Sequence, residues 1–250
     1  MCRLFAYLGP RVTLESVLLA PPYALVTQAY SPRHQRHGRI NADGFGAGWY
    51  EPELRVEPAR YRTTTPMWAD DSFASLAGVV TSGAILAAVR NASPGLPVDE
   101  SCTAPYSNGR WLFAHNGRVQ GFPGEVAVRL RRSLSDERIA QLLGATDSEV
   151  LFGLVLDRID TGLCPPDAIA AVVRDVLDIA PASRLNLCLT DGETVVATAC
   201  GDSLFTHSNP GPGVVIVASE PFDDEPDWTE VADGSVVVAT RTTLETGVLT

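Results

Sequence analysis

The sequence predicts an α+β fold, in which strands come first, a block of helices follows, and strands return at the end. Three observations support this order. An apolar, strand-like run occupies residues 4–8, helical periodicity extends from about 123 to 180, and strand character resumes at Leu185. Because strands and helices are segregated along the chain, the sequence does not have the βαβ alternation of a parallel sheet.

The first half of the chain alternates short elements with polar loops. After the first strand, Thr13 is placed to cap a short helix that reaches about Leu19 and ends before two prolines. Residues 78–90 and 111–114 are predicted as short buried strands. The glycine-rich stretch 44–48 is not a dinucleotide loop, because it lacks a preceding strand, GxGxxG spacing and a following helix.

The second half has clearer boundaries. Apolar residues recur at helical spacing in 148–159 and 168–177, and Pro165-Pro166 mark a helix start between them. Asp191-Gly192 and Gly201-Asp202 lie between alternating apolar runs and are predicted to be two-residue hairpin turns, a signal that Asp233-Gly234 repeats. The result is a C-terminal strand meander, and we expect residues 1–250 to form a single domain.

Composition excludes several classes of function. The net charge is −11 without a basic stripe, which argues against a nucleic-acid partner. No apolar run is long enough for a membrane span, and the N-terminus lacks the pattern of a signal peptide. We therefore expect a cytoplasmic protein with a small-molecule partner. The sequence leaves the oligomeric state open, including a homo-oligomer.

The five cysteines also limit the chemistry. Their number is odd and no CxxC pair occurs, so a disulfide framework and a structural zinc site both fit poorly. His34 and His37 are three residues apart, but no nearby carboxylate or cysteine completes a set of metal ligands. No metal and no organic cofactor are predicted.

Cys2 is the most informative single residue. Removing Met1 leaves a thiol and a free α-amine on the same residue, and such an amine titrates near ~7.7–8.0. The pair forms a minimal unit of nucleophile and base, as in catalytic N-terminal threonines. The alternative is that Cys2 simply starts a buried strand.

Three other segments carry candidate site residues, each with a structural alternative. Arg90 is the last residue of an apolar strand. It is either a snorkelling edge residue or a guanidinium positioned to bind a carboxylate. Asn116 and Gly117 follow a buried strand. They are either two hydrogen-bond donors for an oxyanion or an ordinary hairpin turn. Asp147 comes just before a periodic helix, and it is either an N-cap or first-turn carboxylate or a partner for a substrate ammonium.

Taken in order along the chain, these motifs resemble the class II glutamine amidotransferase domains of the Ntn-hydrolase superfamily. The resemblance implies a four-layer αββα sandwich with two mainly antiparallel sheets. It implies that Cys2 is the nucleophile with its α-amine as base, and that the Asn116 side chain and the Gly117 N–H form the oxyanion hole. Arg90 would hold the α-carboxylate of a glutamyl group, and Asp147, with help from the Asn116-Gly117 region, its α-ammonium.

The departures from the family pattern indicate a branch. Cys2-Arg3 stands in place of the common Cys-Gly start, and Ala88-Val89-Arg90 in place of His-Thr-Arg, which points away from the purine, glucosamine and asparagine branches. Residues 1–4, 41–44 and 219–224 resemble the stand-alone branch that includes the γ-glutamyl-hercynylcysteine S-oxide hydrolases of ergothioneine biosynthesis.

The resemblance implies hydrolysis of a γ-glutamyl amide through a thioester on Cys2, since 250 residues leave no room for an ammonia-receiving domain. Trp49, Tyr50 and Trp68 either contact a trimethylammonium leaving group or belong to the core. Three alternatives stay open: hydrolysis of another γ-glutamyl compound such as a glutathione-derived conjugate, a glutaminase subunit that supplies ammonia to a separate synthetase, and a binding module without activity.

Overall fold

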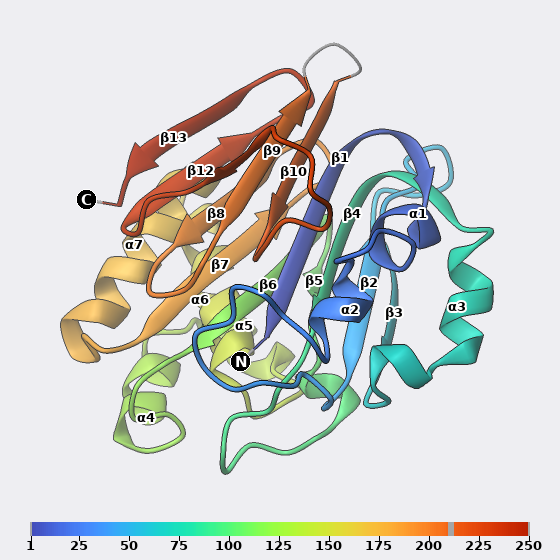
Figure 1. Ribbon diagram of the computed structural model, residues 1–250. Coiled ribbons are helices and arrows are strands. Elements are labelled where there is room, and N and C mark those ends of the chain that lie inside the picture. The colour runs from blue at the N-terminus through green and yellow to red at the C-terminus, as the bar shows by residue number, and fades with distance from the viewer. Residues whose placement is uncertain (1, 210–212, 250) are drawn as a thin grey trace.

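Two β-sheets stack face to face, and a layer of helices covers the outer face of each (Figure 1). The computed structural model describes residues 2–209 and 213–249. One sheet has seven strands in the order β11-β9-β10-β1-β4-β2-β3, and the other has six in the order β13-β12-β8-β7-β6-β5. All the strand pairings given for these residues are antiparallel. The predicted α+β class and the αββα layering are confirmed.

The elements have the following bounds. The strands are β1 Arg3–Thr13, β2 Phe45–Trp49, β3 Ala59–Thr63, β4 Thr81–Val89, β5 Tyr106–Asn108, β6 Trp111–Arg118, β7 Arg184–Thr190, β8 Val195–Ala199, β9 Phe205–Asn209, β10 Val214–Ala218, β11 Trp228–Glu230, β12 Ser235–Ala239 and β13 Leu244–Val248. The α-helices are α1 Leu14–Leu18, α2 Leu25–Gln28, α3 Asp71–Ala77, α4 Glu125–Arg132, α5 Asp136–Gln141, α6 Asp147–Asp160 and α7 Pro165–Ile179, and the short 3₁₀ helices are η1 Met67–Ala69 and η2 Glu100–Cys102.

Strand alternation in β1 serves two apolar layers at once. Leu4 and Leu8 belong to the core between the two sheets, whereas Phe5 and Tyr7 belong to the core under α1–α3. β1 therefore reads as a nearly continuous apolar run, as expected of a strand that is buried on both faces. It lies inside its sheet, paired with β10 on one side and β4 on the other.

A third core lies under the helices of the second sheet. There Phe113 of β6 stacks on Phe152 of α6, with ring centroids 5.2 Å apart. Figure 1 shows α1–α3 at the right of the molecule and α4 and α7 at the left, with the sheets between them. Among residues 2–209 and 213–249, no helix combines the length and apolar character needed to cross a lipid bilayer.

The predicted helix starts are confirmed by their caps. The Thr13 hydroxyl accepts a hydrogen bond from the amide of Ser16 at the start of α1. α7 begins with Pro165 in its first turn, where the missing amide hydrogen costs no intrahelical bond.

The glycine-rich stretch forms β2, where small residues allow the second sheet to approach. A Cβ on Gly46 would overlap the carbonyl oxygen of Ala104, and one on Gly48 would lie 2.7 Å from the Leu112 side chain. These glycines serve close packing rather than a nucleotide phosphate.

The C-terminal strands correct the predicted meander. Asp191-Gly192 does join the hairpin of β7 and β8, as predicted. Gly201-Asp202 and Asp233-Gly234 were predicted to be hairpin turns, and this is wrong, because each joins strands of different sheets. Both glycines have positive φ, +91° and +77°, so the sequence signals a sharp reversal there but not the sheet in which the next strand pairs.

The crossover after β8 is held by one buried side chain, Asn186 of β7. Its Oδ1 accepts from the amides of Cys200 at 2.8 Å and Asp202 at 3.2 Å. Its Nδ2 donates to the carbonyl oxygens of Asp202 at 3.0 Å and Ser203 at 3.2 Å. This amide therefore satisfies backbone groups that no strand pairs.

Replacing Asn186 by alanine should lower the free energy of unfolding by about 3 kcal/mol, since buried backbone donors and acceptors lose their partners. Urea unfolding followed by circular dichroism measures the change. Asn108→Ala is the matched control, because that exposed side chain makes one bond, to Gln141, and its loss should cost less than about 1 kcal/mol. Equal losses for the two variants would contradict the role given to Asn186.

Candidate active site

One pocket brings together residues from four distant parts of the chain. Cys2 at the start of β1, Arg90 after β4, Gly117 near the end of β6 and Asp147 at the start of α6 all line it. Four of the five predicted site residues therefore lie around the same cavity. The fifth, Asn116, lies behind its wall.

The register of two strands places Cys2 beside Arg90. Arg3 pairs with Val89 in the antiparallel ladder of β1 and β4. One step further along each strand, Cys2 and Arg90 lie at the same edge of the sheet. The backbone of Arg90 is fixed as well, since its amide donates to Gly44 and its carbonyl accepts from Asp43.

Arg90 is a buried cation with an unused donor. Its Nη2 donates to the carbonyl oxygen of Pro97 at 2.8 Å, while its buried Nη1 has no partner within residues 2–209 and 213–249. No carboxylate of the described chain forms an ion pair with it. A buried guanidinium without a counterion favours an external anion, and its fork geometry suits a carboxylate.

Asp147 is a first-turn carboxylate of α6, which confirms one of the two structural alternatives, and it is not the cap. The cap is Thr146, whose hydroxyl accepts from the amide of Glu149. Asp147 Oδ2 accepts from the amide of Val119 at 2.9 Å, and Oδ1 from the amide of Ser148 at 2.8 Å. Oδ1 also accepts from Ser148 Oγ at 3.4 Å. These bonds hold the carboxylate at the pocket wall, and Oδ2 keeps a second acceptor position for a cation.

Asn116 and Gly117 are not a hairpin turn. β6 continues through Arg118, so the predicted strand end at residue 114 is wrong. The ladder with β7 pairs Asn116 with Asn186 and Gly117 with Leu185, which the sequence could not indicate. Pairing with β5 stops at Phe113, so on that side the end of β6 has no strand partner among the described residues.

Gly117 must be glycine for steric reasons. A Cβ there would overlap the carbonyl oxygen of Arg184 and lie 2.5 Å from His115 Nε2. Asn116 points to the other sheet, where its Nδ2 donates to Ser219 Oγ at 3.4 Å and its buried Oδ1 has no partner in the described chain. Ser219 Oγ also accepts from the amide of Leu4, which links Asn116 to the strand that carries Cys2.

His115 and Tyr106 also line the pocket, although the sequence analysis gave them no role. His115 Nε2 lies 2.9 Å from the carbonyl oxygen of Arg184 and Nδ1 lies 3.0 Å from Ser148 Oγ. Because a carbonyl only accepts, Nε2 carries the hydrogen. Tyr106 bonds to the Thr146 hydroxyl, and burial raises its pKa. Strand alternation continued past residue 114 would have placed His115 and Gly117 on one face.

The pocket is narrow, with a volume of about 30 Å³. Residues 91–99 have no helix or strand and contribute Asn91, Ala92, Ser93 and Leu96 to the wall.

The structure also bears on a metal site and on the three aromatic residues considered for the leaving group. Among residues 2–209 and 213–249, no group of three His, Cys, Asp or Glu side chains could hold a metal ion. Trp49, Tyr50 and Trp68 do not form one aromatic face. Tyr50 is in the core between the sheets, and Trp49 pairs with Ile85 at the end of β2 that is away from Arg90. Trp68 packs against Tyr30, with ring centroids 5.7 Å apart.

Comparison with known proteins identifies close relatives. A family model described as glutamine amidotransferases class-II matches residues 22–212. The chain is 39% identical over 241 residues to a gamma-glutamyl-hercynylcysteine sulfoxide hydrolase of Mycolicibacterium smegmatis, with 95% of each chain covered. It is 37% identical to a protein of the same name from Mycobacterium tuberculosis, with 96% of this chain and 94% of that one covered.

A solved structure also resembles this one along its whole length. The glutamine aminotransferase class-II domain protein from Silicibacter pomeroyi is 26% identical, with a TM-score of 0.74 and 100% of both chains covered. Its likeness extends to both sheets and both helical layers.

Replacing Gly117 by alanine should lower the free energy of unfolding by about 1–3 kcal/mol, because β7 must move away from the new methyl group. Thermal or urea unfolding measures the loss. Gly247→Ala in β13 is the matched control, since its Cβ would meet only the Val236 side chain at an ordinary 3.5 Å. If both variants were as stable as the wild type, the close contact between β6 and β7 at Gly117 would be refuted.

Proposed function

The chain belongs to the class II glutamine amidotransferase family, and we propose that it is a γ-glutamyl amidohydrolase with Cys2 as its nucleophile. The observation that carries the proposal is the single pocket lined by Cys2, Arg90, Gly117 and Asp147. These residues offer a thiol, a carboxylate-binding cation, a backbone donor and an ammonium-binding anion.

The substrate we propose is γ-glutamyl-hercynylcysteine sulfoxide, which loses its glutamate. The mycobacterial relatives named as hydrolases of this compound align with about 95% of the chain, which supports the branch indicated by the sequence. Their names also favour a hydrolase over a glutaminase subunit or a binding module, and we propose that it acts in the cytoplasm.

In this proposal the glutamyl group is held at both α-substituents. The unused Nη1 of Arg90 donates to the α-carboxylate, and the Asp147 carboxylate accepts from the α-ammonium. Fixing both groups directs the γ-carbonyl carbon toward the sulfur of Cys2, and this positioning supplies the rate advantage of an intramolecular reaction.

The proposed chemistry follows from the residues around Cys2. With Met1 removed, the α-amine takes the thiol proton, the sulfur attacks the γ-carbonyl carbon, and the amine returns the proton to the departing nitrogen. The Gly117 amide stabilises the oxyanion together with Asn116 Nδ2, whose bond to Ser219 is long enough, at 3.4 Å, to be exchanged. Water then hydrolyses the γ-glutamyl thioester. The course requires no metal or organic cofactor.

Cys2→Ala should abolish glutamate release, lowering the turnover number on the order of 10³-fold or more, because it removes the nucleophile. The assay follows glutamate formed from γ-glutamyl-hercynylcysteine sulfoxide. Cys164→Ala is the matched control, because that exposed thiol at the start of α7 does not line the pocket. Full activity of Cys2→Ala, or active protein whose mass retains Met1, would contradict the mechanism.

Arg90→Lys should lower kcat/KM by about 10- to 100-fold, since a lysine ammonium cannot replace a bidentate fork to a carboxylate. Steady-state kinetics with the same substrate measures it. Arg55→Lys is the control, because Arg55 lies in the loop after β2 and donates to Pro58. Unchanged kinetics in Arg90→Lys would exclude its contact with the substrate.

A further inference from the structure

Arg118 follows Gly117 at the end of β6, on the face of the strand that carries Asn116 and opposite the face of His115 and Gly117. Side chains two residues apart on a strand share a face, so Arg118 projects on the same side as Asn116, toward the sheet that carries Cys2. Two residues along a strand span about 7 Å, so Arg118 lies outward of the link between Asn116, Ser219 and Leu4.

Arg118 lacks a partner. Its Nε is buried without an acceptor, and no hydrogen bond or ion pair to its guanidinium is found within residues 2–209 and 213–249. Across the ladder its neighbour is another arginine, Arg184. Like charges directly opposite each other on neighbouring strands destabilise a sheet. This pair therefore needs compensation.

The carboxylates of Asp202 and Glu220 have other partners. Asp202 Oδ2 accepts from Arg184 Nε at 3.3 Å, its Oδ1 has no partner among the described residues, and Asp202 also lies in the field of Arg3 and His37. Glu220 accepts from the backbone amides of Arg33 at 3.0 Å and His34 at 2.7 Å. Neither carboxylate is bonded to Arg118.

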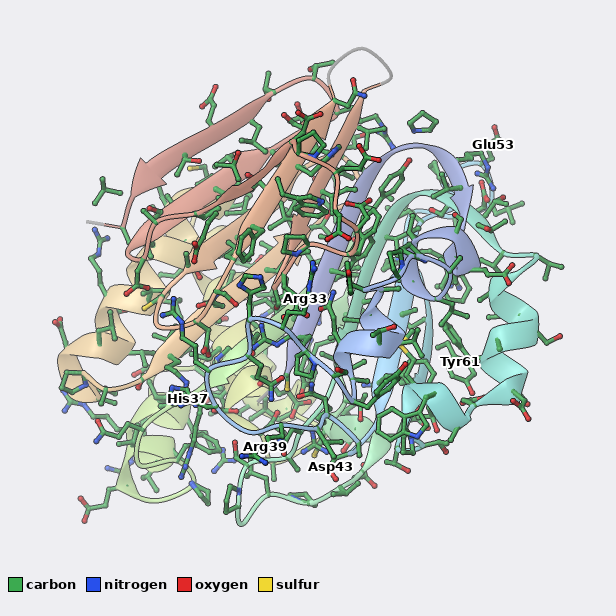
Figure 2. All side chains as sticks on the ribbon, viewed as in Figure 1. Arg33, His37, Arg39, Asp43, Glu53 and Tyr61 are labelled. Atoms are coloured by element: carbon green, nitrogen blue, oxygen red, sulfur yellow. The ribbon has the colours of Figure 1, made fainter. Side chains whose placement is uncertain are left out.

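A loop rich in basic residues lies near the start of β1, next to Arg3. Residues 31–41 join α2 to β2, and Figure 2 shows Arg33, His37 and Arg39 spaced along this loop in front of the start of β1. Gln35 fastens it there, because its Oε1 accepts from Arg3 Nε at 3.3 Å and from Asn41 Nδ2 at 3.0 Å.

The loop adds a further cation that has no carboxylate. Arg36 is exposed, lies within electrostatic range of buried Arg3, and has no partner in the described part of the chain. In a protein of net charge −11, Arg36 and Arg118 thus remain without a counterion among the described residues.

We propose that Arg118, assisted by Arg36 of the 31–41 loop, forms a subsite for a carboxylate on the leaving amine. The inference rests on the proposed γ-glutamyl hydrolysis and specifies its substrate class: γ-glutamyl amino acids, rather than glutamine or simple γ-glutamyl amides. In such substrates the carboxylate is one carbon from the scissile nitrogen, so it must bind next to Cys2. Guanidinium groups bind carboxylates through paired hydrogen bonds.

The experiment compares two compounds that differ in one charge, γ-glutamyl-S-methylcysteine sulfoxide and the same compound with its C-terminal carboxylate converted to a carboxamide. We expect the wild type to cleave the carboxylate with a kcat/KM at least about tenfold higher. Arg118→Gln should reduce this preference about tenfold, mainly through KM, and Arg118→Lys should retain part of it. Arg36→Gln, in an exposed loop, tests the subsite without disturbing β6.

Arg55→Gln, at the far end of β2, is the control for charge and should keep the wild-type preference. Equal cleavage of the two compounds by the wild type, or an unchanged preference in both Arg118→Gln and Arg36→Gln, would overturn the subsite and leave the proposed hydrolysis standing. If the wild type releases glutamate from none of the three compounds, these two and γ-glutamyl-hercynylcysteine sulfoxide, the proposed function itself is overturned.

Discussion

The pairing of β1 with β4 is the constraint on which the rest of the site depends. It places the N-terminal strand inside a seven-stranded sheet and fixes Arg3 opposite Val89. Cys2 and Arg90 are neighbours only in this register. A shift of one residue would also move Leu4 and Phe5 into each other's apolar layers, so the two cores enforce the register that the pocket requires.

β6 is the second strand that positions site residues, and its successive side chains face opposite sides of the sheet. His115 and Gly117 face the pocket, with His115 bonded to Ser148 at the start of α6. Asn116 and Arg118 face the other sheet and the basic loop. The chain stays extended through an Asn-Gly pair that elsewhere would turn, because both residues pair with β7.

The sequence was sufficient where local chemistry decides the structure. The Thr13 cap, the Pro165 helix start and the buried alternation of β1 follow from short-range preferences. It also indicated that Cys2, Arg90, Gly117 and Asp147 would meet, but only through the family's motif order, since no local rule relates residues so far apart. Their assigned roles remain predictions.

Non-local pairing explains what the sequence could not indicate. Gly201-Asp202 looks like a hairpin turn because its glycine needs a positive φ, yet the crossover is set by Asn186, more than a dozen residues away. The length of β6 beyond residue 114 is likewise set by β7, and the unpartnered state of Arg118 by the location of Asp202 beside Arg184.

The burial of Arg3 anchors the start of the chain. Its guanidinium is enclosed, bonded to Gln35 and to Ser203, and its strand is paired on both sides. The residue that follows the proposed nucleophile is therefore held inside the sheet. Because the proposed mechanism requires the removal of Met1, we expect this cleavage to be easier before β1 has paired than after.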